Sequence, residues 1–266
     1  MKVIKIEKSF AIILLAITAV AMQNGQRHKS TLAKESVQIY SMKINKAEME
    51  NERYDKEGIE AEYPQIVSGG NEEELSKWNQ IIQEDFQKII AIYSFNPYLD
   101  LRQTPTGEIP TILKIKYEIK LNTDELLSIT YTADYNSPYS AYPTQLLYTT
   151  NINKTKSERL KLPDVVKLNK DFVKEFRTWD YKTVDEGNLE LNKAIKDYVN
   201  NISDEDLLNG FQTADIIGSG NTWGIYSYLT PDRLVISIGV PNYIGDHVEF
   251  ERDYKKLGNY LKNDIR

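Results

Sequence analysis

Hydrophobic and polar positions follow two different periods along the chain, and these periods predict separate helices and strands. In residues 71–92 apolar side chains recur every three or four positions, behind an Asn71 cap and three glutamates, which is typical of an amphipathic helix. Residues 112–121 alternate strictly between apolar and polar, as a half-buried strand does. Two further strands follow at 126–135 and 145–152, so we expect an antiparallel meander here.

Weaker patterns extend the prediction toward both ends of the chain. Residues 37–44 alternate like a strand. The charge-rich segment 48–62 predicts a strand only after the Gly58 break, from Ile59 through Tyr63, which Pro64 and the Ser-Gly-Gly segment at 68–70 then end. Short helices are expected at 169–176, 189–199 and directly after Ser203, a turn at 162–166, a hairpin at 221–229 and 234–240, and a closing helix at 253–262. The predicted fold class is therefore α+β: a mixed or antiparallel sheet with a long helix packed across it, and a C-terminal hairpin plus helix.

The first 22 residues predict export. Three lysines precede the uncharged apolar run 10–22, which is shorter than the roughly twenty residues that span a bilayer comfortably. Residues 19–21 are Ala-Val-Ala, the small-residue pattern of signal peptidase cleavage. Residues 1–22 are thus a signal peptide or an uncleaved signal anchor, and the cleavage pattern favours the first. Because the basic residues stay on the cytoplasmic side, we expect the rest of the chain to be secreted or extracytoplasmic.

After the leader we expect a polar linker at 23–35 and an extracytoplasmic domain at 36–266, either single or divided into packed subdomains 36–155 and 156–266. The hydrophobic content of 41% is enough for a core, and the charged content of 27% is ordinary. The chain has no cysteine, which excludes disulfides, thiolate metal sites and cysteine nucleophiles. Exported eukaryotic domains often carry disulfides, so we expect a bacterial source.

Few residues suggest catalytic or metal chemistry. There are two histidines: His28 lies in the linker, and His247 has no companion in a zinc-binding pattern, so we expect it to be a surface or hydrogen-bonded residue. The glycine-rich segment 218–224 has no phosphate-loop spacing and precedes a strand rather than a helix. We therefore predict no cofactor, no metal and no catalytic residue. A carboxylate-dependent enzyme remains an open alternative. The chain has 39 acidic residues, so some pair of carboxylates is always available, and the sequence singles out none of them.

Charge and tyrosine content bear on binding partners. The formal charge of -6 argues against nucleic acid and is compatible with a basic protein. Three of the tyrosines, Tyr131, Tyr135 and Tyr148, are expected to pack in the sheet. Tyr139 and Tyr142 lie in a loop bounded by prolines, and exposed loop tyrosines are good contact residues for glycans or proteins. Tyr139 and Tyr142 are the candidate ligand-binding residues.

Several segments together resemble one bacterial extracytoplasmic domain family. They are Tyr-Pro-Gln-Ile at 63–66 before the long helix, the strands ending at 131–135 and spanning 147–152, the Leu-Lys-Leu-Pro-Asp-Val-Val segment at 160–166, the hairpin 223–240, and the closing segments 245–250 and 254–257. The family includes the outer region of RsiV-type lysozyme-sensing anti-sigma factors and the non-catalytic amino-terminal region of the peptidoglycan deacetylase PdaC.

The resemblance implies a non-catalytic binding module at the cell envelope, with an envelope protein such as lysozyme or peptidoglycan as its ligand. The alternative is a carboxylate-dependent enzyme that acts on cell-wall polymers. Residues 140–143 depart from the family, which often has glycine and histidine in this loop. Only residues 1–9 precede the apolar run, so we expect no cytoplasmic sigma-binding segment and no complete anti-sigma factor. Membrane contact is expected only through the leader, if it is uncleaved.

Overall fold

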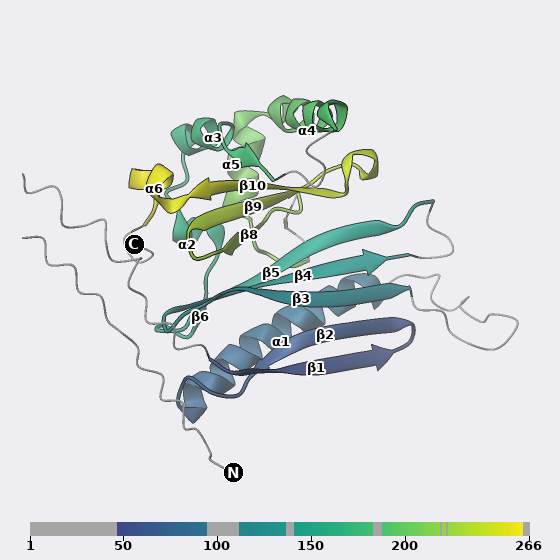
Figure 1. Ribbon diagram of the computed structural model, residues 1–266, viewed down its shortest axis with the longest axis vertical. Helices are drawn as coiled ribbons and strands as arrows, with labels where there is room; N and C mark the ends of the chain where they lie inside the picture. The colour runs from purple at the N-terminus through teal and green to yellow at the C-terminus, as the bar shows by residue number, and fades with distance from the viewer. Residues whose placement is uncertain are drawn as a thin grey trace, which may run out of the picture. The chain divides into compact units, whose positions relative to one another are not determined.

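The computed structural model describes residues 47–94, 112–136, 141–182, 188–218, 220–221 and 223–262 (Figure 1). The leader at 1–22, the linker at 23–35 and the expected strand at 37–44 lie outside these residues. Within the described part of the chain, no helix is both long and apolar enough to cross a membrane.

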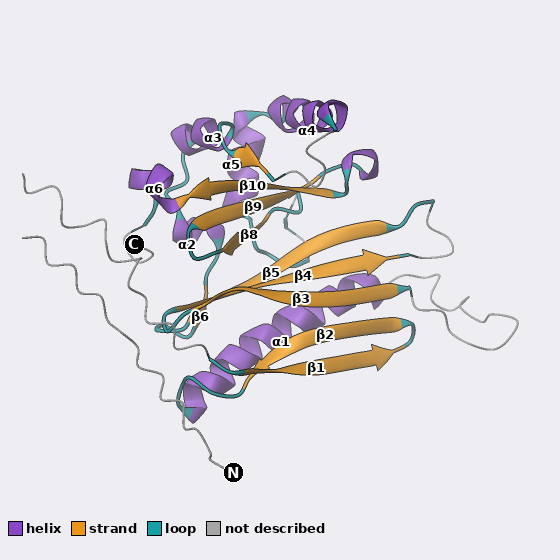
Figure 2. Cartoon of the chain, in the orientation of Figure 1, coloured by secondary structure: helices purple, strands orange, loops and turns teal. Residues whose placement is uncertain are grey.

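The first of two sheets has six strands in the order β1-β2-β3-β4-β5-β6. They are β1 (Met49–Lys56), β2 (Ile59–Ile66), β3 (Leu113–Asn122), β4 (Leu126–Tyr135), β5 (Thr144–Asn153) and β6 (Glu158–Arg159). All neighbours are antiparallel except β2 and β3, which pair in parallel over three residues only. The meander β3-β4-β5 confirms the prediction from the alternating pattern. The helix α1 (Glu72–Ser94) packs across this sheet (Figure 2).

Helix α1 begins and packs as its sequence predicts. The Glu74 amide donates to Asn71 Oδ1 at 3.0 Å, and the Asn71 amide donates to Glu74 Oε2 at 2.9 Å, which forms a capping box. The inward face buries Trp78 and Phe86 against the sheet. Asp85 is also buried there, and it accepts hydrogen bonds from Thr150 Oγ1 and Arg159 Nε at 3.1 Å each. The helix is thus fixed to β5 and β6 by polar as well as apolar contacts.

The second sheet has four antiparallel strands in the order β7-β10-β9-β8. They are β7 (Asp180–Tyr181), β8 (Tyr226–Leu229), β9 (Arg233–Gly239) and β10 (His247–Asp253). The helices of this part of the chain are α2 (Leu162–Val165), α3 (Lys170–Phe176), α4 (Leu189–Asn201), α5 (Asp204–Gln212) and α6 (Tyr254–Leu257). The α3, α4 and α5 helices lie on the side of this sheet away from the first sheet, and β8 lies against β5 (Figure 1). The structure therefore confirms a mixed α+β fold with a C-terminal hairpin and helix.

Strand β2 continues past Pro64 to Ile66, so of the two signals expected to end it only the Ser-Gly-Gly segment at 68–70 does. The amide of Ile66 donates to Asn79 Oδ1, and its carbonyl accepts from Asn79 Nδ2, so the backbone of Ile66 faces α1 rather than β1. Pro64 lies two residues earlier and directs its nitrogen to the same side, because strand backbones alternate. No ladder hydrogen bond is lost there, since β3 pairs with β2 only as far as Ala61. Pro64 therefore lies within β2 instead of ending it.

Three further elements differ from the prediction. Strand β1 was missed because it is an edge strand with charged residues on both faces. The expected turn at 162–166 contains the one-turn helix α2. The expected closing helix at 253–262 is reduced to α6 and a 3-10 turn, η4 (Gly258–Tyr260), because Asp253 still pairs with β9 and Gly258 has a φ of 49°.

Two hydrophobic clusters form the core. One is centred between α1 and the first sheet and also includes Tyr226, Tyr228 and Val235 of the second sheet. The other is centred between the second sheet and its helices and also includes Leu121 and Leu126 of the first sheet.

Between β4, β5 and β8 the contact combines the Tyr148 and Tyr226 rings, whose centroids lie 5.2 Å apart, with a set of polar groups. Ser128 Oγ donates to Asn151 Oδ1 at 2.5 Å and accepts from the Leu229 amide at 2.9 Å, while Asn151 Nδ2 donates to the Ser227 carbonyl at 2.8 Å. We call Ser128, Asn151, Asp215 and Ser227 the polar seam.

Asp215 is the charged member of the polar seam. Its carboxylate accepts from Ser227 Oγ and the Leu162 amide at 2.7 Å each, from Thr149 Oγ1 at 3.2 Å and from the Ser227 amide. The residue as a whole is only partly buried, but the carboxylate group is enclosed by protein. Burial raises the pKa of Asp215 to about 6, although the four hydrogen bonds favour the charged form. One side chain thereby joins β5, α2 and β8.

Replacing Trp78 tests the first core. The side chain is 2% exposed, and its Nε1 donates to Ser157 Oγ at 3.1 Å. Trp78→Ala should lower the free energy of unfolding by about 3–5 kcal/mol in urea melts, as large aromatic truncations in cores do. Ile92→Ala is the matched control on the same helix, because Ile92 is 41% exposed. A loss below about 1 kcal/mol for Trp78→Ala would show that this face of α1 is not the buried one.

Replacing Asp215 tests the charge in the polar seam. Because burial raises the pKa of Asp215 from 3.8 to about 6, the folded protein holds this proton more tightly than the unfolded chain does. Its contribution to stability is therefore largest below about pH 4 and falls by up to roughly 3 kcal/mol as the pH rises through 6. Asp215→Asn cannot titrate, so wild type should lose stability relative to this variant over that range. If urea melts show that the stability of wild type relative to Asp215→Asn stays constant or rises with pH, burial does not dominate the pKa of Asp215.

Candidate functional site

The predicted binding residue Tyr142 lies in the loop between β4 and β5. Tyr142 is 66% exposed, as expected for a contact residue. Tyr139 lies outside the described residues. The tyrosines expected to pack in the sheet do so: Tyr131 and Tyr148 are buried, and the Tyr135 ring lies 5.3 Å from that of Tyr93.

A second exposed tyrosine lies in the connection between β9 and β10. The 3-10 turn η3 (Asn242–Ile244) carries Tyr243, which is 78% exposed. The next residue, Ile244, is buried in the core of the second sheet, and the Val240 amide donates to the Asp246 carbonyl at 2.8 Å. The hydrogen bond between Val240 and Asp246 therefore closes the base of this loop, and the buried side chain of Ile244 anchors the loop next to the exposed ring of Tyr243. Sequence reasoning missed Tyr243, although it lies between Pro241 and Gly245, as Tyr142 lies in a proline-bounded loop.

Hydrogen bonds hold the two loops together. Asn242 Nδ2 donates to the Pro143 carbonyl at 3.0 Å and to Asp246 Oδ1 at 3.0 Å. The other carboxylate oxygen of Asp246 accepts from the Gln145 amide at 2.9 Å. We call Tyr142, Pro143, Asn242 and Tyr243 the two-loop surface, because it exists only where these two connections meet.

The residues beneath this surface restrict its backbone. Gly245 and Asp246 have φ angles of 115° and 65°, in the left-handed region that glycine and aspartate tolerate better than most residues. His247 Nδ1 lies 3.1 Å from the Gln145 carbonyl oxygen, which confirms that His247 is a hydrogen-bonded residue. Gln145 Nε2 in turn donates to Asp134 at 2.7 Å. The loops therefore present their tyrosines on a constrained base that also carries two carboxylates.

The surface can bind but pairs no groups for covalent chemistry. Its polar groups are amides and carboxylates already joined to one another, with no nucleophile beside a base. Among the described residues, no group of three potential metal ligands comes together. The glycine-rich segment also fits its non-catalytic interpretation: Asn221 bonds to both backbone groups of Ile225, and the chain continues into β8 rather than a helix.

Comparisons with known proteins give relatives in structure only. No protein-family model matches the sequence. No curated protein matches it significantly. A solved DUF3298 family protein from Pseudomonas aeruginosa PAO1 is similar, with 12% identity and a TM-score of 0.47 over 82% of this chain and 94% of that one. A DUF3298 family member from Bacteroides fragilis NCTC 9343 has 15% identity and a TM-score of 0.39 over 82% of this chain and 92% of that one. The structural neighbours of this chain are thus DUF3298 family proteins, the domain family to which the resemblance in its sequence refers.

Proposed function

We propose that this chain is an exported, non-catalytic binding module of the bacterial cell envelope, and that its two-loop surface contacts a basic protein such as lysozyme. The observation that carries the proposal is the pairing of two highly exposed tyrosines on loops that are bonded to each other. The export part rests on the leader at 1–22.

Tyrosines in this arrangement are suited to recognition. A tyrosine offers a large ring and a polar tip while few rotatable bonds are frozen on binding. Interface energy concentrates in a few such aromatic anchors. Because Asp246 and Asn242 already bond Gln145 and Pro143, the backbone at these points has less conformational entropy to lose when a partner binds.

Charge favours a basic partner. The formal charge of the chain is -6, and Asp134 and Asp246 lie beside the two loops. Long-range attraction of this kind raises the association rate and makes binding sensitive to salt.

The environment of Asp215 favours binding over the carboxylate-enzyme alternative. Its carboxyl group has a raised pKa, but hydrogen-bond donors of the protein enclose it, so it is unsuited to acid catalysis on a substrate.

Removing both rings tests the surface. Tyr142→Ala combined with Tyr243→Ala should weaken binding to lysozyme by roughly 1–4 kcal/mol, the range of interface hot spots, without loss of folding. Titration calorimetry at two salt concentrations measures the affinity, and soluble peptidoglycan fragments form a parallel arm. Ile92→Ala removes an exposed apolar side chain from α1 and should leave affinity unchanged.

The outcomes of that titration separate the partner from the site. If wild type binds only peptidoglycan fragments or nothing, the basic-protein partner is wrong. If the double variant binds lysozyme as tightly as wild type does, the partner is right and the two-loop surface is not its site.

Removing Asp246 tests preorganisation. Asp246→Ala leaves both tyrosines in place but deletes the acceptor for Asn242 and Gln145, so the rings should sample more conformations before binding. We expect affinity for lysozyme to fall by about 1–2 kcal/mol, with a less favourable binding entropy in calorimetry. Asp246→Asn keeps one acceptor and tolerates the left-handed backbone, and it should fall in between. Because both variants also remove the charge of Asp246, the salt dependence of their affinities separates the two effects: a loss that persists at high salt belongs to the hydrogen bonds. Unchanged affinity in both variants would mean that neither the hydrogen bonds nor the charge of Asp246 contributes.

A further inference from the structure

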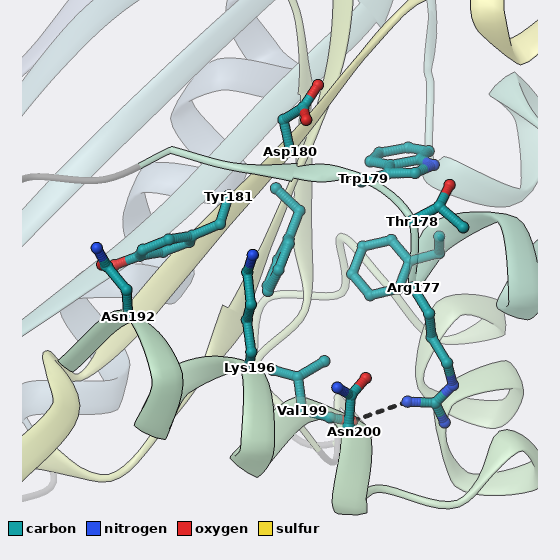
Figure 3. Close-up of a pocket in the computed structure, with 11 residues that line it drawn as sticks. Arg177, Thr178, Trp179, Asp180, Tyr181, Asn192, Lys196, Val199 and Asn200 are labelled. Atoms are coloured by element: carbon teal, nitrogen blue, oxygen red, sulfur yellow. Dashed lines mark hydrogen bonds between the residues drawn. The ribbon is translucent and has the colours of Figure 1, made fainter. Parts of the chain in front are cut away.

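A cavity of about 380 Å³ opens between α4 and the segment that leads into β7 (Figure 3). This volume falls at the small end of ligand-binding sites, which are about 300–1,000 Å³. The cavity belongs to the second sheet and its helices, and none of the residues of the two-loop surface line it.

One side of the cavity is aromatic. Its rings come from Phe176, Trp179, Tyr181 and Phe250. The Phe176 ring lies 5.1 Å from that of Phe250, and the Tyr181 ring lies 5.8 Å from the same Phe250 ring. Phe176, Trp179 and Phe250 are buried and Tyr181 is half-buried, so the wall is fixed by packing while one ring remains accessible.

The opposite side is polar and comes from α4. Asn192, Lys196 and Asn200 follow at intervals of four residues, which places them on one face of the helix. Figure 3 shows Lys196 reaching from α4 toward the segment that carries Tyr181, while the carboxylate of Asp180 points away from α4. Among the described residues, no carboxylate lies within ion-pair distance of Lys196.

The other cation at the cavity is already engaged. Arg177 donates to Asp204 Oδ1 at 2.8 Å and to the carbonyls of Val199 and Ile202 at 3.0 and 2.7 Å. The bidentate group best suited to phosphate is therefore used inside the protein. What remains for a ligand is one ammonium group, two amides and an aromatic wall.

We propose that this cavity binds a sugar acid. The apolar face of a sugar ring would pack on Tyr181, the amides of Asn192 and Asn200 would bond its hydroxyl groups, and Lys196 would pair with its carboxylate. A few placed polar groups opposite an apolar wall are the usual make-up of a small-molecule site. The proposal extends the function proposed above and does not depend on it, because the two sites share no residue.

Three probes separate the parts of this recognition. D-glucuronate carries both ring and carboxylate, D-glucose carries the ring alone, and acetate carries the carboxylate alone. Amide and side-chain NMR shifts of the full-length protein should report saturable binding of D-glucuronate at Tyr181, Asn192 and Lys196. D-glucose should bind more weakly by up to about fivefold, as expected for loss of an exposed ion pair, and acetate should cause no saturable change there.

Variants on α4 identify the ammonium group. Lys196→Ala should abolish the preference for D-glucuronate over D-glucose, whereas Lys196→Arg should retain it. Lys193→Ala is the matched control, because Lys193 is an exposed lysine of α4 outside the cavity lining. The proposal is overturned if D-glucose binds as tightly as D-glucuronate, if the two alanine variants behave alike, or if no probe gives saturable shifts at tens of millimolar. Because Tyr142 and Tyr243 lie elsewhere, their double variant should keep this binding, so failure here is distinct from failure of the lysozyme titration.

Discussion

Paired, buried polar groups align the two sheets of this protein, next to apolar contacts such as that between the Tyr148 and Tyr226 rings. Strands β4 and β5 bury one face against α1 with residues such as Leu127 and Ile129, and they turn Ser128 and Asn151 toward β8 on the other. A buried polar face is stable only if nearly all of its groups are paired. The polar seam meets this condition, because Asn151 bonds the Ser227 carbonyl and Asp215 collects four donors from three elements.

The candidate binding surface depends on this contact. Tyr142 follows a strand of the first sheet, whereas Tyr243 lies between two strands of the second. The bonds from Gln145 to Asp246 and from Asn242 to Pro143 join residues about a hundred positions apart, and they can form only when β5 and the β9–β10 turn are in the right register. The cavity beside α4 has no such requirement, since its lining comes from the second sheet and its helices.

Sequence patterns predicted the elements that have one strong period and failed where a residue's partner is distant. Helix α1 and the β3-β4-β5 meander are long and regular, so their existence and direction could be predicted. The covering of the polar positions of β4 and β5 by a second sheet could not be predicted, because their partners on β8 lie some 75 to 100 residues further along the chain. Strand β7 has only two residues, too few for any pattern.

The same distinction applies to the candidate sites. Tyr142 was predictable from its proline-bounded loop, and Tyr243 had a similar local signal. Their meeting was not predictable, because it requires the seam to align strands that are far apart in sequence. Likewise Asn192, Lys196 and Asn200 have the spacing of an ordinary solvated helix face. Their aromatic counterpart comes from Tyr181 and from Phe250 on β10, some fifty residues further along the chain.

The polar part of the contact between the sheets fixes their register in a way that apolar packing does not. Apolar faces can slide against each other with little change in buried area, since the hydrophobic effect has no direction. A network of directional hydrogen bonds loses several partners at once if the register shifts, and each unpaired buried group costs about 1–3 kcal/mol. Burying the Asp215 carboxylate lowers net stability relative to a fully apolar contact. In return, Ser227 and Asn151 admit one alignment of β5 with β8, and that alignment brings Gln145 within reach of Asp246.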